Sequence, residues 1–207
     1  MDINTNITKK SWNPPKHLAK DYLHNYPPGT KKQLANFMKE KGLKSALDIG
    51  CGNAQLYPIL KKEVPSLEYT GIDGSKSLID AAKEVVGNDG TLVLEDMYKY
   101  MQNNTHQYDV SVLSHILECV ESPEMLVDLA SKSSKYLAIL WFDTPKYQYD
   151  AVIVAESAHP GEGFRPYIRR KMGAGFWKYI VTHYGLEGVY RVGDGPNNIL
   201  DIYERKK

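Results

Sequence analysis

Short apolar runs alternate with helical patterns between residues 45 and 142. Five runs are mostly apolar without strict alternation, which is typical of parallel strands buried on both faces. These runs span 45–50, 67–72, 91–95, 108–114 and 135–142. Between them, apolar residues recur at helical spacing over 54–63, 77–86 and 123–132, with helix-start residues at Ser75, Ser122 and Pro123. This order predicts right-handed βαβ units and a doubly wound α/β sheet.

The flanking segments predict further elements. Two short helices are expected over 16–24 and 31–41, separated by a turn rich in proline and glycine. After the fifth strand, 143–172 has the composition of a long connection, and 175–184 follows as an aromatic helix. Two strand patterns at 188–192 and 199–205 are joined by the turn-rich GDGPNN. This short link predicts an antiparallel pair at one edge of the sheet.

The composition favours one soluble globular domain. The chain has 207 residues, of which 42% are apolar and 25% charged, enough for one sizeable core. Cys51 and Cys119 are too few for a disulfide framework or a zinc site, so we expect no metal. The N-terminus lacks a secretory apolar core, and the longest apolar run, 137–142, is far below the roughly 18 residues of a membrane span. We therefore expect a cytoplasmic protein that does not insert into membranes.

Charge is balanced overall but unevenly distributed. The formal net charge is +1, which argues against binding nucleic acid or anionic lipid by bulk charge. Residues 1–45 carry 9 basic and 3 acidic side chains, residues 46–150 carry 8 and 16, and residues 151–207 carry 9 and 6. Basic flanks around an acidic centre are compatible with closure over an anionic ligand, although solvated surface lysines explain most such charges.

The segment ALDIGCGNAQLYPIL, at 46–60, is the most informative in the chain. An apolar strand leads to Asp48, after which Gly50 and Gly52 allow a tight turn into a helix. Ligands of such sheets lie beyond the carboxyl ends of the strands, so this loop predicts a nucleotide-like cofactor. The dinucleotide fingerprint requires glycine or alanine where the chain has Gln55, and no phosphate loop is present. Both features disfavour dehydrogenases and nucleoside triphosphatases.

Two more carboxylates follow predicted strands. Asp73 ends the second strand 21 residues after Gly52, where a carboxylate can accept hydrogen bonds from both ribose hydroxyls. Asp96 follows the third strand and could accept from an adenine amino group, with Met97 packed on the ring. For Asp96, capping of a following helix is the alternative.

These motifs resemble the class I S-adenosylmethionine-dependent methyltransferases, in the subgroup that methylates small molecules. The resemblance covers about residues 44–142 and rests on LDIGCGNA, YTGID, LVLED and YDVSVLSHILECVESPEML. It implies a Rossmann-like seven-stranded sheet in the order 3-2-1-4-5-7-6 with an antiparallel edge hairpin and an N-terminal helical cap. It also implies S-adenosylmethionine as cofactor and S-adenosylhomocysteine as product.

The resemblance assigns three groups of cofactor-binding residues. The methionyl part would be lined by Asp48, Gly50, Cys51, Gly52 and Ala54, and the ribose by Asp73 and Gly74. The adenine would lie against Asp96 and Met97, and the sulfur beside Ser114, His115 and Ile116. Ala54 departs from the family, in which this third small residue of the loop is commonly glycine.

Methyl transfer from a sulfonium is an in-line displacement that requires no metal or covalent nucleophile, although a hydroxyl acceptor benefits from a general base. His115 is the first candidate base and His159 the second. A hydrogen-bonded structural histidine is the alternative at both positions.

Residues outside the resemblance are expected to bind the acceptor. We divide the chain into an N-terminal helical cap at 1–43 and a cofactor-binding core at 44–207, with 143–176 as an acceptor-binding insertion. Arginine suits carboxylate or phosphate, which favours a small polar or anionic acceptor. The candidate acceptor-binding residues are Tyr22, Tyr26, Phe164, Arg165, Tyr167, Arg169 and Arg170, and simple packing of the cap is the alternative for many of them.

The leading hypothesis is therefore an O- or N-methyltransferase acting on a small metabolite or sugar, as a monomer or homodimer. One alternative is an RNA methyltransferase that uses basic residues within 1–45. The other is a module that binds the cofactor without turnover, since fold analogy alone does not establish catalysis.

Overall fold

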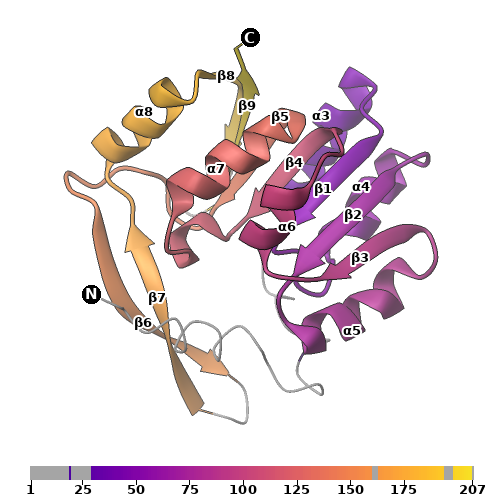
Figure 1. The fold of residues 1–207 in the computed structure, drawn as a ribbon, viewed down its shortest axis with the longest axis horizontal. Coiled ribbons are helices and arrows are strands. Elements are labelled where there is room, and N and C mark those ends of the chain that lie inside the picture. The colour runs from indigo at the N-terminus through magenta and orange to yellow at the C-terminus, as the bar shows by residue number, and fades with distance from the viewer. Residues whose placement is uncertain (1–18, 20–28, 160–162, 194–197, 207) are drawn as a thin grey trace.

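The structure, a computed structural model, describes residues 19, 29–159, 163–193 and 198–206, and within 155–168 it describes no side chains. A seven-stranded sheet forms its centre, in the order β3-β2-β1-β4-β5-β9-β8 (Figure 1). The strands are β1 (Ser45–Ile49), β2 (Glu68–Asp73), β3 (Gly90–Leu94), β4 (Tyr108–Ser114), β5 (Ser134–Trp141), β8 (Leu186–Gly193) and β9 (Ile199–Arg205). The first five are parallel, whereas β9 is antiparallel to β5 and to β8. The predicted strand order and edge hairpin are confirmed, with β8 and β9 as the sixth and seventh strands of the sheet.

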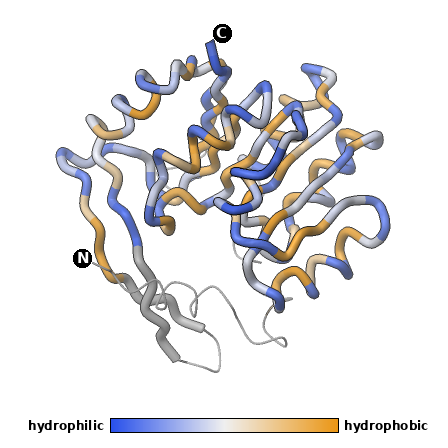
Figure 2. The backbone as a smooth tube through the Cα atoms, in the orientation of Figure 1, coloured by the Kyte–Doolittle hydropathy of each residue, from blue (hydrophilic) through white to orange (hydrophobic). Residues whose placement is uncertain are grey.

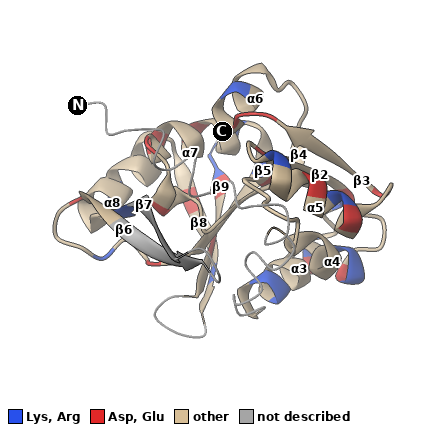
Figure 3. Cartoon of the chain, turned by 90° about the horizontal axis from the view of Figure 1, so that it is seen from below, with Lys and Arg blue, Asp and Glu red and all other residues tan. Residues whose placement is uncertain are grey.

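Helices cover both faces of this sheet. They are α3 (Gly29–Lys41), α4 (Leu56–Glu63), α5 (Lys76–Val86), α6 (Met97–Asn103), α7 (Pro123–Lys132), α8 (Ala174–His183) and the 3-10 helix η1 (Leu117–Cys119). In a view turned by 90°, α3 and α4 lie on one side of the strands and α6 and α7 on the other (Figure 3). None of the described helices, the longest of 13 residues, has the length and apolarity that a membrane span requires.

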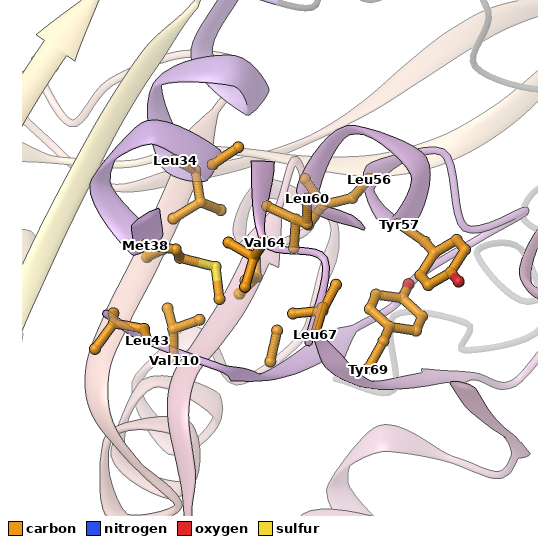
Figure 4. Packing of buried hydrophobic residues seen from close by; sticks show 14 of the residues in the cluster. Leu34, Met38, Leu43, Leu56, Tyr57, Leu60, Val64, Leu67, Tyr69 and Val110 are labelled. Atoms are coloured by element: carbon orange, nitrogen blue, oxygen red, sulfur yellow. The ribbon is translucent and has the colours of Figure 1, made fainter. Parts of the chain in front are cut away.

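The parallel strands are mostly apolar because alternate side chains enter two different cores. In β5, Tyr136, Ala138 and Leu140 join the core shared with α3 and α4. Leu137, Ile139 and Trp141 join the core shared with α7 and α8. Figure 4 shows the first core, where Leu34 and Met38 of α3 pack near Leu60 of α4. The helix α3, which falls within the predicted N-terminal cap, thus packs into the same core as the sheet.

Local sequence signals explain several boundaries. The Ser75 hydroxyl accepts a hydrogen bond from the Leu78 N–H at the start of α5, and Pro123 occupies the first turn of α7. Ser122 makes no side-chain capping bond. The sequence analysis missed α6, which is only seven residues long and begins after the capping residue Asp96.

The long connection predicted over 143–172 contains two strands that the sequence analysis did not predict. β6 (Ala151–His159) pairs with β7 (Gly163–Lys171) in a separate antiparallel ribbon. The ribbon extends away from the main sheet, and an apolar part of β6 lies beside a hydrophilic part of β7 (Figures 1 and 2). Val152 and Val154 remain 42% and 61% exposed. None of the side chains described in the ribbon, at 151–154 and 169–171, is buried, whereas the parallel strands of the main sheet were predicted as runs buried on both faces.

Candidate functional site

The glycine loop follows β1 and turns under the end of β2. The backbone N–H groups of Gly50 and Cys51 both donate to the Ile72 carbonyl, over 2.8 and 2.9 Å. Gly50 has a φ of +72°, and a Cβ at this position would lie 2.2 Å from Cδ1 of Ile116. The backbone conformation therefore favours glycine here, and an added Cβ would also have to displace the Ile116 side chain in the loop after β4.

Ala54, the departure from the family pattern, is fully buried and has a φ of +59°. This left-handed conformation costs a non-glycine residue about 1–2 kcal/mol. The loop thus keeps the conformation that glycine would adopt, at the expense of local strain.

Asp73 joins the end of β2 to the glycine loop. One carboxylate oxygen accepts from the Gly52 N–H over 2.9 Å, and the other accepts from the Ser75 N–H over 2.8 Å. Burial raises the pKa of Asp73, and these two bonds oppose the rise. Each oxygen can accept a further hydrogen bond.

Asp48 is almost completely buried, with 1% of its surface exposed. Its Oδ2 accepts from the Tyr69 hydroxyl over 2.7 Å, whereas Oδ1 has no hydrogen-bond partner among the described residues. Burial raises the pKa of Asp48 to about 6, against the opposing effects of Tyr69 and of the positive charge on Lys31. The carboxylate therefore has one oxygen available to a cationic donor.

Lys31, on α3, is a buried cation that the sequence analysis did not select. It is 6% exposed, and no hydrogen bond or ion pair joins its ammonium to another described residue. Burial lowers its pKa, opposed by the charge of Asp48, and its own charge acts on His115. Its helical spacing with Leu34, Ala35 and Met38 places it on the apolar face of α3, which is the signal that could have identified it.

His115 directly follows β4 and adopts a φ of +55°. Its backbone N–H donates to the Leu140 carbonyl over 2.8 Å, and its imidazole lies against the Phe142 ring, with centroids 4.5 Å apart. Burial first and the charge of Lys31 second lower its pKa to about 4, while a hydrogen bond with the Trp141 backbone opposes this. The imidazole is therefore neutral at pH 7.

The remaining cofactor candidates lie at the same edge of the sheet, because the carboxyl ends of parallel strands meet there. Ser114 is the last residue of β4 and is half-buried, whereas Gly74, after β2, is exposed. Asp96, after β3, accepts hydrogen bonds from the Tyr98 and Lys99 N–H groups. The capping alternative considered for Asp96 is thus present in the structure.

The β6–β7 ribbon brings two arginines close to η1, and the two differ in whether they have partners among the described residues. Arg170 forms an ion pair with Asp150 at 2.5 Å, donates to the Glu121 carbonyl over 3.0 Å and lies over the Phe176 ring. Arg169 is half-buried, and no hydrogen bond or ion pair links it to another residue in the described ranges. Its charge acts on the carboxyl groups of Glu118 and Asp143.

Several predicted site residues fall outside this description. Tyr22 and Tyr26 are not among the described residues. His159, Phe164, Arg165 and Tyr167 belong to the β6–β7 ribbon by their backbone, but their side chains are not described.

Comparison with known proteins gives one matching family profile and many solved structures of similar fold. A family profile described as a methyltransferase domain matches residues 47–139. The chain matches no curated protein in sequence.

Three solved structures illustrate the likeness in fold. An O-methyltransferase family protein from Burkholderia thailandensis has a TM-score of 0.70 at 13% identity, and the match covers 92% of this chain and 59% of that one. Magnesium protoporphyrin IX methyltransferase from Synechocystis, with bound S-adenosylhomocysteine, has a TM-score of 0.70 at 14% identity over 98% and 100%. The N-methyltransferase NodS from Bradyrhizobium japonicum, with the same ligand, has a TM-score of 0.67 at 15% identity over 97% and 100%.

Proposed function

We propose that the chain is a class I S-adenosylmethionine-dependent methyltransferase that methylates an oxygen or nitrogen atom of a small polar or anionic acceptor. The methyltransferase-domain profile over residues 47–139 and the order of the sheet support this proposal. The acceptor would be a metabolite or sugar, and S-adenosylhomocysteine would be the second product. The similar structures are named for different acceptors and for both O- and N-methylation. They support small-molecule methylation as the shared theme.

The observation that carries this proposal is the pair of buried opposite charges beside the glycine loop. Lys31 has no ion-pair partner among the described residues, and Asp48 has one carboxylate oxygen without a hydrogen bond there. Buried charges are costly unless they are paired. The methionyl part of the cofactor is a zwitterion, so its carboxylate would satisfy Lys31 and its ammonium would satisfy Asp48.

The rest of the loop fits the nucleoside part. Asp73 is fixed by two backbone N–H groups and retains acceptor capacity for the ribose hydroxyls. Gly74 is exposed, and a Cβ built there would approach only the Glu95 carbonyl, at 3.9 Å, which leaves room beside the ribose. Asp96 keeps one carboxylate oxygen outside its capping bonds for the adenine amino group, while Met97 is half-buried next to it.

When bound, the cofactor supplies a methyl group activated by a positively charged sulfur. The residues of the chain then need only align the acceptor and remove its proton. His115 fits the second task because its imidazole is neutral at pH 7 and follows β4 at the edge of the sheet where the cofactor candidates lie.

Arg169 supports a negative or polar group on the acceptor. Its guanidinium is half-buried without a described partner, whereas the adjacent Arg170 is occupied by Asp150 and Glu121. A planar carboxylate or phosphate would pair with Arg169 through two parallel hydrogen bonds. This supports the insertion at 143–176 as the acceptor-binding part.

The proposal is tested by measuring S-adenosylhomocysteine formation from S-adenosylmethionine with a panel of small acceptors. The panel pairs carboxylated or phosphorylated sugars and amines with neutral analogues. We expect turnover with an anionic member, and Arg169→Met should raise its KM about tenfold or more, while the exposed control Lys178→Met leaves it unchanged. Turnover with neutral analogues alone would refute the anionic acceptor. Salt-sensitive binding of RNA together with RNA methylation would favour the alternative function.

A further inference from the structure

Glu118 is a buried carboxylate that the proposed reaction does not use. It lies in η1, directly after β4, and is 1% exposed. Its Oε1 accepts hydrogen bonds from the N–H groups of Phe142 and Asp143, over 2.8 and 3.1 Å. These are the first two residues after β5, so the carboxylate ties the segment after β4 to the segment after β5.

This tie reaches His115 through Phe142. The Phe142 ring packs on the His115 imidazole at 4.5 Å, with an angle of 39° between the ring planes. His115 itself is anchored to β5 by its N–H bond to Leu140 and by a hydrogen bond with the Trp141 backbone. The backbone at the end of β5 thus positions His115, and Glu118 in turn positions the residues that follow β5.

Burying the Glu118 carboxylate costs free energy, which indicates that a hydrogen-bond acceptor is needed at this position. Oε2 of Glu118 is buried and has no hydrogen-bond partner among the described residues. Burial raises the pKa of Glu118 to about 7, against the two backbone bonds and the charge of Arg169. An apolar side chain of similar size would avoid this desolvation but would leave two buried N–H groups unsatisfied.

The geometry points to Glu118 as a positioning residue, which holds the Phe142 backbone so that the Phe142 ring fixes the His115 imidazole. The inference rests on the proposed function, since orientation of His115 matters for turnover only if it is the base. The structural link from Glu118 to His115 can be measured without a methyl acceptor.

Asp109 provides a matched control. Its Oδ2 also accepts two backbone N–H bonds, from Lys44 and Ser45, over 2.6 and 2.9 Å. It is near the start of β4 and beside the start of β1, at the opposite end of the strands from His115. Loss of Asp109 therefore removes an equivalent brace without touching the proposed link.

The test follows the histidine ring signals by NMR as a function of pH, with His115 assigned from its loss in His115→Gln. In Glu118→Leu, we expect the His115 signals to lose the ring-current shift from Phe142 and their pH midpoint to rise by about 1 unit, because water then reaches the imidazole. Glu118→Gln, which retains an acceptor oxygen, and Asp109→Ala should keep the wild-type signals. If Glu118→Leu fails to fold, Glu118→Asp, too short to reach both N–H groups, should give the same change in part.

A folded Glu118→Leu or Glu118→Asp protein with wild-type His115 signals would overturn the inference, as would an equal change in Asp109→Ala. Calorimetric titration of each variant with S-adenosylhomocysteine tests cofactor binding separately from the link between Glu118 and His115. Absence of binding by the wild type would reject the proposed function while leaving the NMR result interpretable. With an active acceptor, Glu118→Leu should lower kcat about tenfold or more at an unchanged dissociation constant for S-adenosylhomocysteine.

Discussion

The carboxylate of Asp73, at the end of β2, accepts a hydrogen bond from the Gly52 N–H over 2.9 Å. The same side chain also accepts from the Ser75 N–H at the start of α5. The residue proposed to bind the ribose is therefore also the residue that shapes the glycine loop. Its role in cofactor binding and its role in the loop must be separated by graded substitutions.

Asp73→Ala should weaken S-adenosylhomocysteine binding about 10²-fold or more, because two charge-assisted hydrogen bonds to the ribose disappear together with the bonds to the loop. Asp73→Asn can still accept one N–H bond and one hydroxyl bond, so we expect a smaller loss. Isothermal calorimetry measures both. Equal binding by wild type and Asp73→Ala would exclude the ribose role.

Gly50→Ala should destabilise the fold more than Gly42→Ala, although both glycines have a positive φ. The added Cβ would lie 2.2 Å from Ile116 Cδ1, and the φ of +72° adds backbone strain, for a combined cost of about 2–4 kcal/mol. Gly42 is the control, since its φ is +66° but no atom lies within 4 Å of an added Cβ. Gly42→Ala should cost only about 1 kcal/mol in urea unfolding. Similar losses at both sites would contradict the close contact between the two loops.

Lys31→Met should raise the pKa of His115, because the ammonium of Lys31 disfavours the imidazolium. The wild-type pKa is lowered to about 4, so the neutral form is lost only as the pH falls through this region, and in Lys31→Met it is lost at higher pH. Lys32→Met, at the exposed neighbouring position of α3, should leave the midpoint unchanged. Histidine NMR titrations of the three proteins check this. Saturation with S-adenosylhomocysteine should also raise the wild-type midpoint, as its carboxylate neutralises Lys31.

Asp48→Asn should stabilise the protein without cofactor and weaken the complex. Burial raises the pKa of Asp48 to about 6, so the folded state binds a proton more tightly than the unfolded chain, and stability falls as pH rises from about 4 to beyond 6. The introduced amide carries no charge, so the variant does not lose stability in this way. After subtraction of the cost of a buried amide donor without a partner, it should be about 1–2 kcal/mol more stable than wild type at pH 8 and no more stable at pH 4. Asp80→Asn, at a half-buried carboxylate paired with Lys76, should give no such gain.

Chemical denaturation across this pH range measures the stability effect, and calorimetry should show S-adenosylhomocysteine binding to Asp48→Asn weakened about tenfold or more. A variant that is less stable than wild type at pH 8 would contradict the conclusion that the buried charge of Asp48 destabilises the folded protein in the absence of cofactor.

The parallel strands and their order could be predicted because the strands are mostly apolar and three of the four crossovers contain a helix with a clear apolar stripe, α4, α5 and α7. β4 and β9 were predicted with their observed bounds, 108–114 and 199–205. The β6–β7 ribbon could not be predicted in this way, since Val152 and Val154 stay exposed. α6 was missed because a helix of only seven residues is too short to show a clear helical periodicity.

The candidate site was predictable where backbone geometry constrains residue type. Gly50 and Asp73 follow from the tight turn and from the strand end. Lys31 could have been selected, since its helical spacing with Leu34, Ala35 and Met38 places it on the apolar face of α3. Glu118 could not, because its importance depends on its burial and on its hydrogen bonds to the two residues after β5. These contacts arise only when η1 and the ends of β4 and β5 come together, across separations that no local pattern encodes.

The most direct test of the central claim is calorimetric titration of the wild-type protein with S-adenosylmethionine, S-adenosylhomocysteine and 5′-methylthioadenosine. The account predicts one site for the first two ligands, with dissociation constants of about 1–100 µM, and binding of methylthioadenosine at least about tenfold weaker, because it lacks the zwitterion that Lys31 and Asp48 would hold. Failure to bind either of the first two ligands, or equal binding of all three, would contradict it.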